Sequence, residues 1–296
     1  MAYARHQSFY LRDRWISKGL TSVSKNPRFF YEDDAAEQIG LGKNMLQSLR
    51  FWLNAMNLIK EEKVNQKTVH TLSFFGSWVL DNDRWLLDNT TISLLHYYLV
   101  KNDKDLATVF QWFFNESNIS SIIREELLVN FEAWVRNREA KQVSVKSLKK
   151  DIDCLVQLYT KAPDEADPES VTFSPLHKIG LIEEKVNFDS RLLLKRMTPK
   201  PDQIGSEALF YTLNDYAYQN DRELISVDEI VSEPGLWGKV YHLNRDDVFY
   251  VLNKMVNEGF YKIEYVRTNK LDNVKLIPVK PEELLKTLIV REGGVY

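Results

Sequence analysis

Apolar side chains recur at helical spacing through much of the chain, and the clearest case lies near the N-terminus. Leu46, Leu49, Leu53 and Met56 follow one another at intervals of three, four and three positions, which places them on one helix face. The short run EDDAAEQI precedes them, and the glycines of GLGKN stand between the two segments. This pattern predicts a helix-turn-helix.

The other face of the second predicted helix carries side chains that suit DNA. Lys43 can contact a phosphate, Arg50 a guanine, and Gln47 and Asn54 an adenine. Asn44 is a further candidate contact and the predicted N-terminal cap of this helix. Gly42-Lys43 also resembles the end of a phosphate-binding loop, but the required glycine spacing and the Ser or Thr after the lysine are missing.

The next segment, NLIKEEKVNQKTVHTLSFFG, has two short apolar patches around a polar tip. It predicts a β-hairpin in which residues 58–59 pair near residues 69–72, as in the wing of a winged helix. Lys63 and Lys67 near the tip are candidate phosphate contacts. A winged helix used only for protein contacts is the alternative, because a fold does not fix a function.

The hydrophobic pattern divides the remainder into two further parts. Residues 81–195 predict a helical domain with an acidic linker near 161–170, and residues 195–205 form a second, proline-containing linker. Residues 206–296 predict another winged-helix-like domain, whose long helix stops at Gly259. The fold class is therefore mainly α, with winged helix-turn-helix modules near both termini, the first in residues 1–80. The C-terminal module suits association, such as a homodimer, as well as it suits DNA.

Composition supports a packed protein whose N-terminal part is the most basic. The chain is 44% hydrophobic and 27% charged, with a net charge of −3, yet residues 1–78 hold 11 Lys or Arg against 7 Asp or Glu. The single cysteine, Cys154, excludes an intrachain disulfide and has apolar neighbours that predict a buried thiol. No apolar run is long enough for a membrane span, and the N-terminus lacks a signal-peptide pattern, so we expect a cytoplasmic protein.

The N-terminal segment RHQSFYLRDRW concentrates groups that could cut DNA. On a helix, His6, Tyr10 and Asp13 would follow i, i+4, i+7 spacing, so a base, a hydroxyl and a carboxylate would share one face. The alternative is a first helix with a solvated polar face. Carboxylate-dependent cleavage usually uses a divalent ion, for which Mg²⁺ or Mn²⁺ is the candidate, and its ligands are unknown.

Several phrases together resemble an uncharacterised bacterial family whose genes often accompany DNA phosphorothioation genes. They are RHQSFYLRDRWISKGL, LGKNMLQSLRFWLNAMNLI, LLHYYLV, FQWFFNE and VSVKSLKKDIDCLVQLY, with SPLHKIGLI further on. The resemblance covers about the first 160 residues and this last phrase. Family members often place a cysteine near Ser174, so any role of that thiol is absent from this chain.

The resemblance implies a function as well as partners. The characterised role in the family is the nicking subunit of the Ssp-type single-strand phosphorothioation system. A cysteine desulfurase, an ATP pyrophosphatase-like sulfurtransferase and an ATPase accompany that subunit. By this resemblance, the protein binds DNA and nicks one strand so that sulfur can be incorporated. Two alternatives are a non-catalytic DNA-binding adaptor or regulator that recruits the sulfur-transfer enzymes, and a structural partner of the ATPase.

Overall fold

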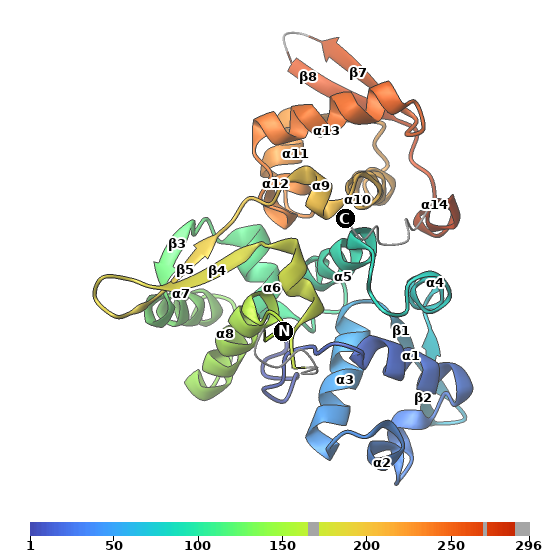
Figure 1. Ribbon diagram of the computed structural model, residues 1–296, viewed down its shortest axis with the longest axis vertical. Coiled ribbons are helices and arrows are strands. Elements are labelled where there is room, and N and C mark those ends of the chain that lie inside the picture. Colours follow the sequence, from blue (N-terminus) through green and yellow to red (C-terminus); the bar gives the residue numbers. More distant parts are fainter. Residues whose placement is uncertain (165–171, 269–270, 288–296) are drawn as a thin grey trace.

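The computed structural model describes residues 1–164, 172–268 and 271–287. Most of these residues are helical, and three small antiparallel sheets lie among the helices (Figure 1). This confirms the prediction of a mainly helical protein. Residues 165–170, the larger part of the predicted acidic linker, lie outside the described residues.

The N-terminal part places a helix pair next to a hairpin. The turn between the two helices passes through Gly40, whose φ of +68° favours glycine. In the hairpin, Ile59 pairs with Leu72, as predicted, and the turn residues Asn65 and Gln66 both have positive φ. The elements are α1 (Trp15–Lys25), η1 (Phe29–Tyr31), α2 (Ala35–Ile39), α3 (Lys43–Ala55), β1 (Ile59–Val64), β2 (Lys67–Leu72) and α4 (Phe74–Asn82).

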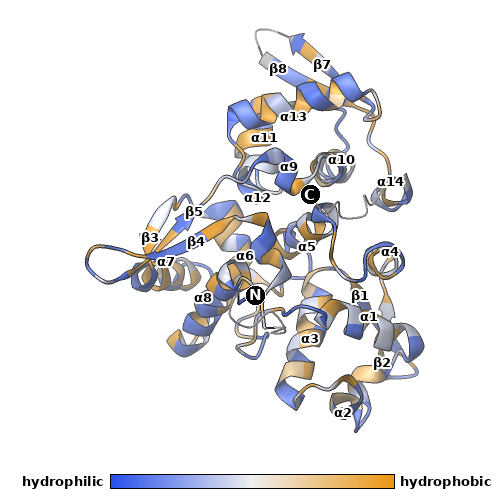
Figure 2. Ribbon diagram, viewed as in Figure 1, coloured by the Kyte–Doolittle hydropathy of each residue, from blue (hydrophilic) through white to orange (hydrophobic). Residues whose placement is uncertain are grey.

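The apolar face of α3 packs against α1. Leu49, Leu53 and Met56 are completely buried, as their spacing predicts, and hydrophobic and hydrophilic bands alternate along the helix (Figure 2). The two helices approach closely at Gly19, where a Cβ atom would lie 2.6 Å from Cδ1 of Leu53. This contact fixes α3 so that its polar face points away from the core.

The central part contains a sheet that helical periodicity does not predict. Strand β5 pairs with both β3 and β4, and Ser121 lies opposite Lys195. The predicted linker at 195–205 is wrong in part, because it overlaps the end of β5 and contains α9 (Pro201–Ile204). The elements are α5 (Asn89–Lys101), α6 (Thr108–Gln111), η2 (Trp112–Glu116), β3 (Ser121–Ile123), α7 (Arg124–Arg136), α8 (Val145–Thr160), η3 (Pro175–Ile179), β4 (Ile182–Val186) and β5 (Leu192–Arg196).

The C-terminal part builds a three-stranded sheet in the order β6-β8-β7 next to α11 and α13. Asn244 and Asp247 form a capping box at the start of α13, and the helix stops at Gly259, as predicted, where φ is +66°. The elements are α10 (Ser206–Gln219), β6 (Leu224–Ser226), α11 (Val227–Ser232), α12 (Trp237–Val240), α13 (Arg245–Glu258), β7 (Ile263–Thr268), β8 (Leu271–Leu276) and α14 (Pro281–Thr287).

Helix α5 lies between the N-terminal and C-terminal parts and connects their cores (Figure 1). Buried apolar side chains form one cluster from Tyr10 to Leu285. Within it, His96 of α5 accepts a hydrogen bond from the Tyr159 hydroxyl at 2.6 Å and donates one to the Val240 carbonyl at 2.7 Å. These partners suit neutral imidazole, and burial lowers the pKa of His96 to about 4.

The core contains the single cysteine of the chain. Cys154 is buried, as expected from its neighbours, and burial raises the pKa of its thiol well above the usual value. Within residues 1–164, 172–268 and 271–287, no helix combines the length and the apolar character that a membrane crossing requires.

Candidate nucleic-acid interface

The polar face of α3 is exposed in its first half and half-buried in its second half. Lys43, Asn44 and Gln47 are exposed, whereas Arg50 and Asn54 are half-buried. The predicted capping role of Asn44 is wrong, because α3 begins at Lys43 and Gly42 occupies the N-cap position. Asn44 therefore projects from the first turn of the helix, where its side chain is available for other contacts.

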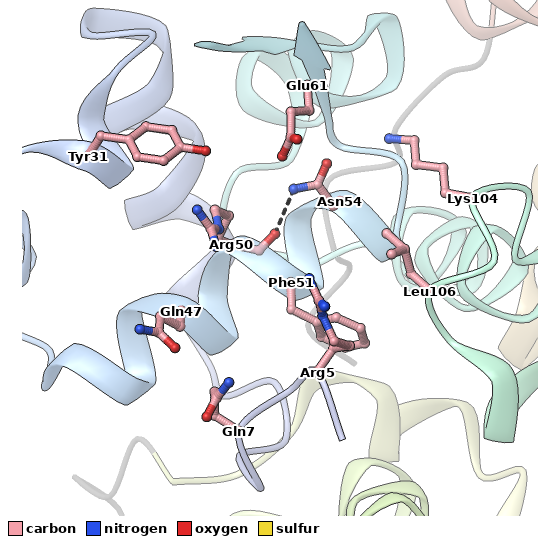
Figure 3. Close-up of a pocket in the computed structure, with 10 residues that line it drawn as sticks. All are labelled: Arg5, Gln7, Tyr31, Gln47, Arg50, Phe51, Asn54, Glu61, Lys104 and Leu106. Atoms are coloured by element: carbon pink, nitrogen blue, oxygen red, sulfur yellow. Dashed lines mark hydrogen bonds between the residues drawn. The ribbon is translucent and has the colours of Figure 1, made fainter. Parts of the chain in front are cut away.

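A cavity of about 550 Å³ lies against the second half of this face (Figure 3). Its floor is α3 itself, which contributes Gln47, Arg50, Phe51 and Asn54. The side chain of Asn54 donates a hydrogen bond to the Arg50 carbonyl at 3.0 Å, which holds its amide over the helix. Four other segments form the rim, from which come Arg5, Gln7, Tyr31, Glu61, Lys104 and Leu106.

The cavity carries more positive than negative charge. Arg5, Arg50 and Lys104 line it together with one carboxylate, Glu61. Lys104 is fixed by a hydrogen bond from its Nζ to the Ile59 carbonyl at 2.9 Å. Burial, followed by the nearby charge of Lys60, lowers the pKa of Lys104.

An aromatic side chain, Tyr31, forms one side of the rim. Its ring stacks on His70, with 5.7 Å between centroids and 15° between planes, and it is 39% exposed. The guanidinium groups of Arg28 and Arg50 lie 4.9 and 5.6 Å from its centroid. His70 is in turn held by Glu61, at 3.3 Å between Nε2 and Oε2. The ring is therefore fixed in place beside the cavity.

The hairpin β1–β2 extends from the same part of the molecule. Lys63 and Lys67 are exposed and flank its turn, since Lys63 pairs with Thr68 and Lys67 with Val64. Neither side chain lines the cavity. They lie outside the cavity, on the hairpin that follows α3.

The predicted shared helix face of His6, Tyr10 and Asp13 is wrong. Residues 4–14 are turns and extended chain, and helix α1 begins only at Trp15. The Tyr10 hydroxyl donates to the Thr172 carbonyl, and burial raises the pKa of this phenol. Asp13 faces Arg14, with 3.5 Å between Oδ2 and Nε. The three side chains therefore point to different partners.

His6 is buried at the base of this N-terminal turn. It is 1% exposed, its Nδ1 accepts from the Ser8 amide at 3.1 Å, and its Nε2 lies 2.8 Å from Oδ1 of Asp151 in α8. Because Nδ1 accepts an N–H, Nε2 carries the proton and donates it to Asp151. This pair anchors the turn whose neighbouring residues, Arg5 and Gln7, line the cavity.

Sequence reasoning found the floor of the cavity but missed its rim. Tyr31 and Lys104 come from two segments without a helical or motif signal, whereas Glu61 lies in the predicted hairpin but was not among the predicted contacts. For Arg5, density of charge in the first fifteen residues was the only signal. Proximity of such segments depends on tertiary contacts, which periodicity does not encode.

The exposed face of α13 differs from that of α3. Tyr250, Asn253 and Asn257 are exposed, whereas the ammonium of Lys254 pairs with Asp202 at 2.7 Å. Asp246 and Asp247 lie in the first turn of the helix, after Arg245, which pairs with Asp228 and Asp272. These acidic and paired groups make this face less suited to phosphate than the face of α3.

The geometry thus defines a helical protein that has a basic cavity on one helix, with a tyrosine on the rim of this cavity. The chain belongs to the family described as "Protein of unknown function (DUF4007)", whose sequence model matches residues 3–291. This agrees with the resemblance found in the sequence. A comparison with curated proteins finds no match.

Two solved structures have the same fold. They are described as "Magnesium ion-bound SspB crystal structure" and "SspB crystal structure". Each is 24% identical to this chain, with a TM-score of 0.85, and the alignment covers 96% of this chain and 86% of the other. The similarity therefore extends over almost the whole fold.

The magnesium in one of these structures raises the question of a metal site in this chain. Among the residues that the structure describes, no three His, Cys, Asp or Glu side chains converge as ligands for a metal ion. The described side chains thus do not fit a divalent ion held by protein ligands alone.

Proposed function

We propose that this protein binds DNA through α3 and nicks one strand as a component of a DNA phosphorothioation system, which serves DNA modification and defence against phage. The family resemblance of phrases such as LGKNMLQSLRFWLNAMNLI supports this proposal, and so does the fold shared with the SspB structures. The proposed partners are DNA and the cysteine desulfurase, ATP pyrophosphatase-like sulfurtransferase and ATPase of the same system. Such partners imply a cytoplasmic location.

We assign α1, α2, α3 and the hairpin β1–β2 to a winged helix-turn-helix. In that motif the last helix contacts DNA and the hairpin lies beside it. The order α10, β6, α11, α13, β7, β8, with β8 in the centre of its sheet, supports a second such module. We assign DNA contact to the first module and association, such as a homodimer, to the second, because the face of α13 is acidic at its start and Lys254 is paired.

The basic cavity on α3 is the observation that carries the proposal. Phosphate attraction dominates nucleic-acid affinity, and Arg5, Arg50 and Lys104 gather at one site against Glu61 alone. Planar amide groups, which can bond base edges, lie between these cations. Lys43 and Asn44 continue the surface beyond the cavity, and Lys63 and Lys67 extend it along the hairpin.

The cutting chemistry is a separate part of the proposal. His6, Tyr10 and Asp13 remain its candidates, and Asp13 is the most accessible of the three, with a side chain that is 19% exposed. The burial of His6 and its pairing with Asp151 favour a structural role for that residue. Because such cleavage usually needs a divalent ion, the assays should contain Mg²⁺ or Mn²⁺.

A non-catalytic adaptor that recruits the sulfur-transfer enzymes to DNA is the second candidate function. It is favoured by the positions of His6, Tyr10 and Asp13, which point to different partners and do not form one site. Incubation of purified protein with supercoiled plasmid in Mg²⁺ or Mn²⁺ separates the two functions. The nickase gives open circles that Asp13→Asn reduces, whereas the adaptor shifts DNA on a gel without cutting it. A protein that neither shifts nor cuts DNA would contradict both.

A further inference from the structure

The second half of the α3 face that was expected to read DNA is partly covered. Arg50 and Asn54 are half-buried on the floor of the cavity and Gln47 is exposed at its edge, while a rim of side chains from η1, β1, the N-terminal turn and the segment after α5 lies around them (Figure 3). Tyr31, Gln7 and Lys104 stand on this rim. Only the first turn of α3, with Lys43 and Asn44, lies outside it.

This recess conflicts with insertion of α3 into the major groove of a duplex. The groove is about 12 Å wide, and a helix with its side chains is about 10–12 Å in diameter, so the helix alone fills it. The rim residues line the same cavity as the reading side chains, so their elements would have to enter the groove together with the helix, and the groove has no room for them. A regular duplex can therefore contact the rim and the exposed Gln47 but does not reach the half-buried Arg50 and Asn54 in the same way as a groove-inserted helix would.

The cavity suits a single nucleotide instead. Its volume of about 550 Å³ lies within the range of about 300–1,000 Å³ that holds ligands of drug size, and a nucleotide is of that size. Proteins hold unpaired bases by stacking them on aromatic rings and attract their phosphates with cations. The Tyr31 ring stacks on His70 and has the guanidinium groups of Arg28 and Arg50 over it, so a base would take the place of a guanidinium on this ring. Arg5 and Lys104 offer cations on the rim.

Side chains on the floor of the cavity can recognise the edge of a base. Gln47 and Asn54 are planar amides that can bond the edge of a base, and Glu61 can accept from an exocyclic amino group. Phe51 gives the floor one apolar surface. Such edge contacts are accessible only when the base is not paired with its complement.

We infer that this cavity binds one unpaired nucleotide of a DNA strand, stacked at Tyr31 with its edge toward Gln47 and Asn54. The inference rests on the proposed DNA-binding function and specifies the form of DNA that the site takes. The duplex on either side would then contact Lys43 and the hairpin lysines.

Fluorescence anisotropy at fixed salt tests the inference with three labelled DNA probes of one length. They are a single strand, a perfect duplex, and a duplex with one bulged nucleotide. We expect the single strand and the bulged duplex to bind about 10-fold more tightly than the perfect duplex. Tyr31→Ala should lose about 10-fold on these two probes and little on the perfect duplex, whereas Tyr31→Phe should retain binding.

Two further variants control for folding and for general effects. Tyr218→Ala removes a tyrosine of similar exposure on α10, 43% against 39%, and should bind all three probes like the wild type. Gln47→Ala is an exposed helix substitution that keeps the fold and should also lower the preference for unpaired DNA.

These outcomes distinguish the nucleotide site from the broader DNA-binding function. Equal binding of the three probes, unaffected by Tyr31→Ala and Gln47→Ala, would overturn the nucleotide site while the DNA-binding function stands. Absence of binding to every probe at low salt would overturn both. Loss of binding to the unpaired probes alone in the two cavity variants supports the inference.

Discussion

Replacing His6 by alanine tests whether this side chain anchors the N-terminal turn or takes part in cutting DNA. The wild-type imidazole donates to Asp151 at 2.8 Å, and both groups are buried, at 1% and 4% exposure. The substitution leaves the carboxylate without this donor; the Ala4 amide, at 2.9 Å, is the partner that remains. Removing a buried hydrogen bond to a charged group costs about 1.5–3 kcal/mol.

That cost is a substantial fraction of the total free energy of unfolding, which is about 5–15 kcal/mol for a typical domain. His6→Gln keeps an N–H donor that can reach Asp151 and should recover much of the lost stability. Urea unfolding followed by circular dichroism measures both variants, with nicking assayed in parallel at a temperature where each remains folded. The anchor predicts a destabilised His6→Ala and a His6→Gln that nicks nearly as well as the wild type.

A different result would support the cutting role expected from the sequence. If His6→Ala unfolds at the wild-type urea concentration but no longer nicks, and His6→Gln behaves in the same way, the anchoring argument is refuted. In that case the buried imidazole would have to become accessible during the reaction.

Three further outcomes follow from α3 and from the junction at α5. Leu49→Ala should lower the free energy of unfolding by about 2–5 kcal/mol in urea titrations, because it empties a fully buried position. Lys43→Ala should reduce the salt dependence of DNA binding by about one unit of slope, whereas Arg50→Ala should cost about 1–3 kcal/mol on a preferred sequence and relax that preference. Unchanged affinity in both variants at low salt would exclude α3 from the interface. The pKa of His96 is about 4 in the folded protein, below its ordinary value of 6.5. The stability that neutral His96 contributes is therefore complete above about pH 6.5 and is lost as the pH falls toward 4. Urea midpoints measured against pH should show this loss, and His96→Gln should make the pH dependence flatter.

Local patterns predicted the parts of the fold that depend on neighbouring residues. The spacing of Leu49, Leu53 and Met56 predicted the buried face of α3, and Gly259 predicted the end of α13. Both features depend only on neighbouring residues, through helical spacing and a positive φ. The pairing of Ile59 with Leu72 likewise follows from a short hairpin.

Features that depend on distant residues were not predictable in this way. Strand β3 pairs with β5, and Ser121 lies opposite Lys195, so no short window of the sequence contains both strands. The N-terminal segment was expected to be helical, but it forms a turn in which His6 hydrogen-bonds to Asp151 in α8. The rim of the cavity, with Tyr31 and Lys104, is assembled by the same kind of long-range contact.

Photo-crosslinking measures most directly whether DNA occupies the cavity on α3. A single strand with one 5-iodouracil is irradiated with the wild-type protein, and the crosslinked peptide is identified by mass spectrometry. The proposal predicts crosslinks at Tyr31 or within residues 43–55, and their loss in Arg50→Ala. Crosslinks that lie only in the C-terminal module, around Tyr250, and persist in Arg50→Ala would contradict it.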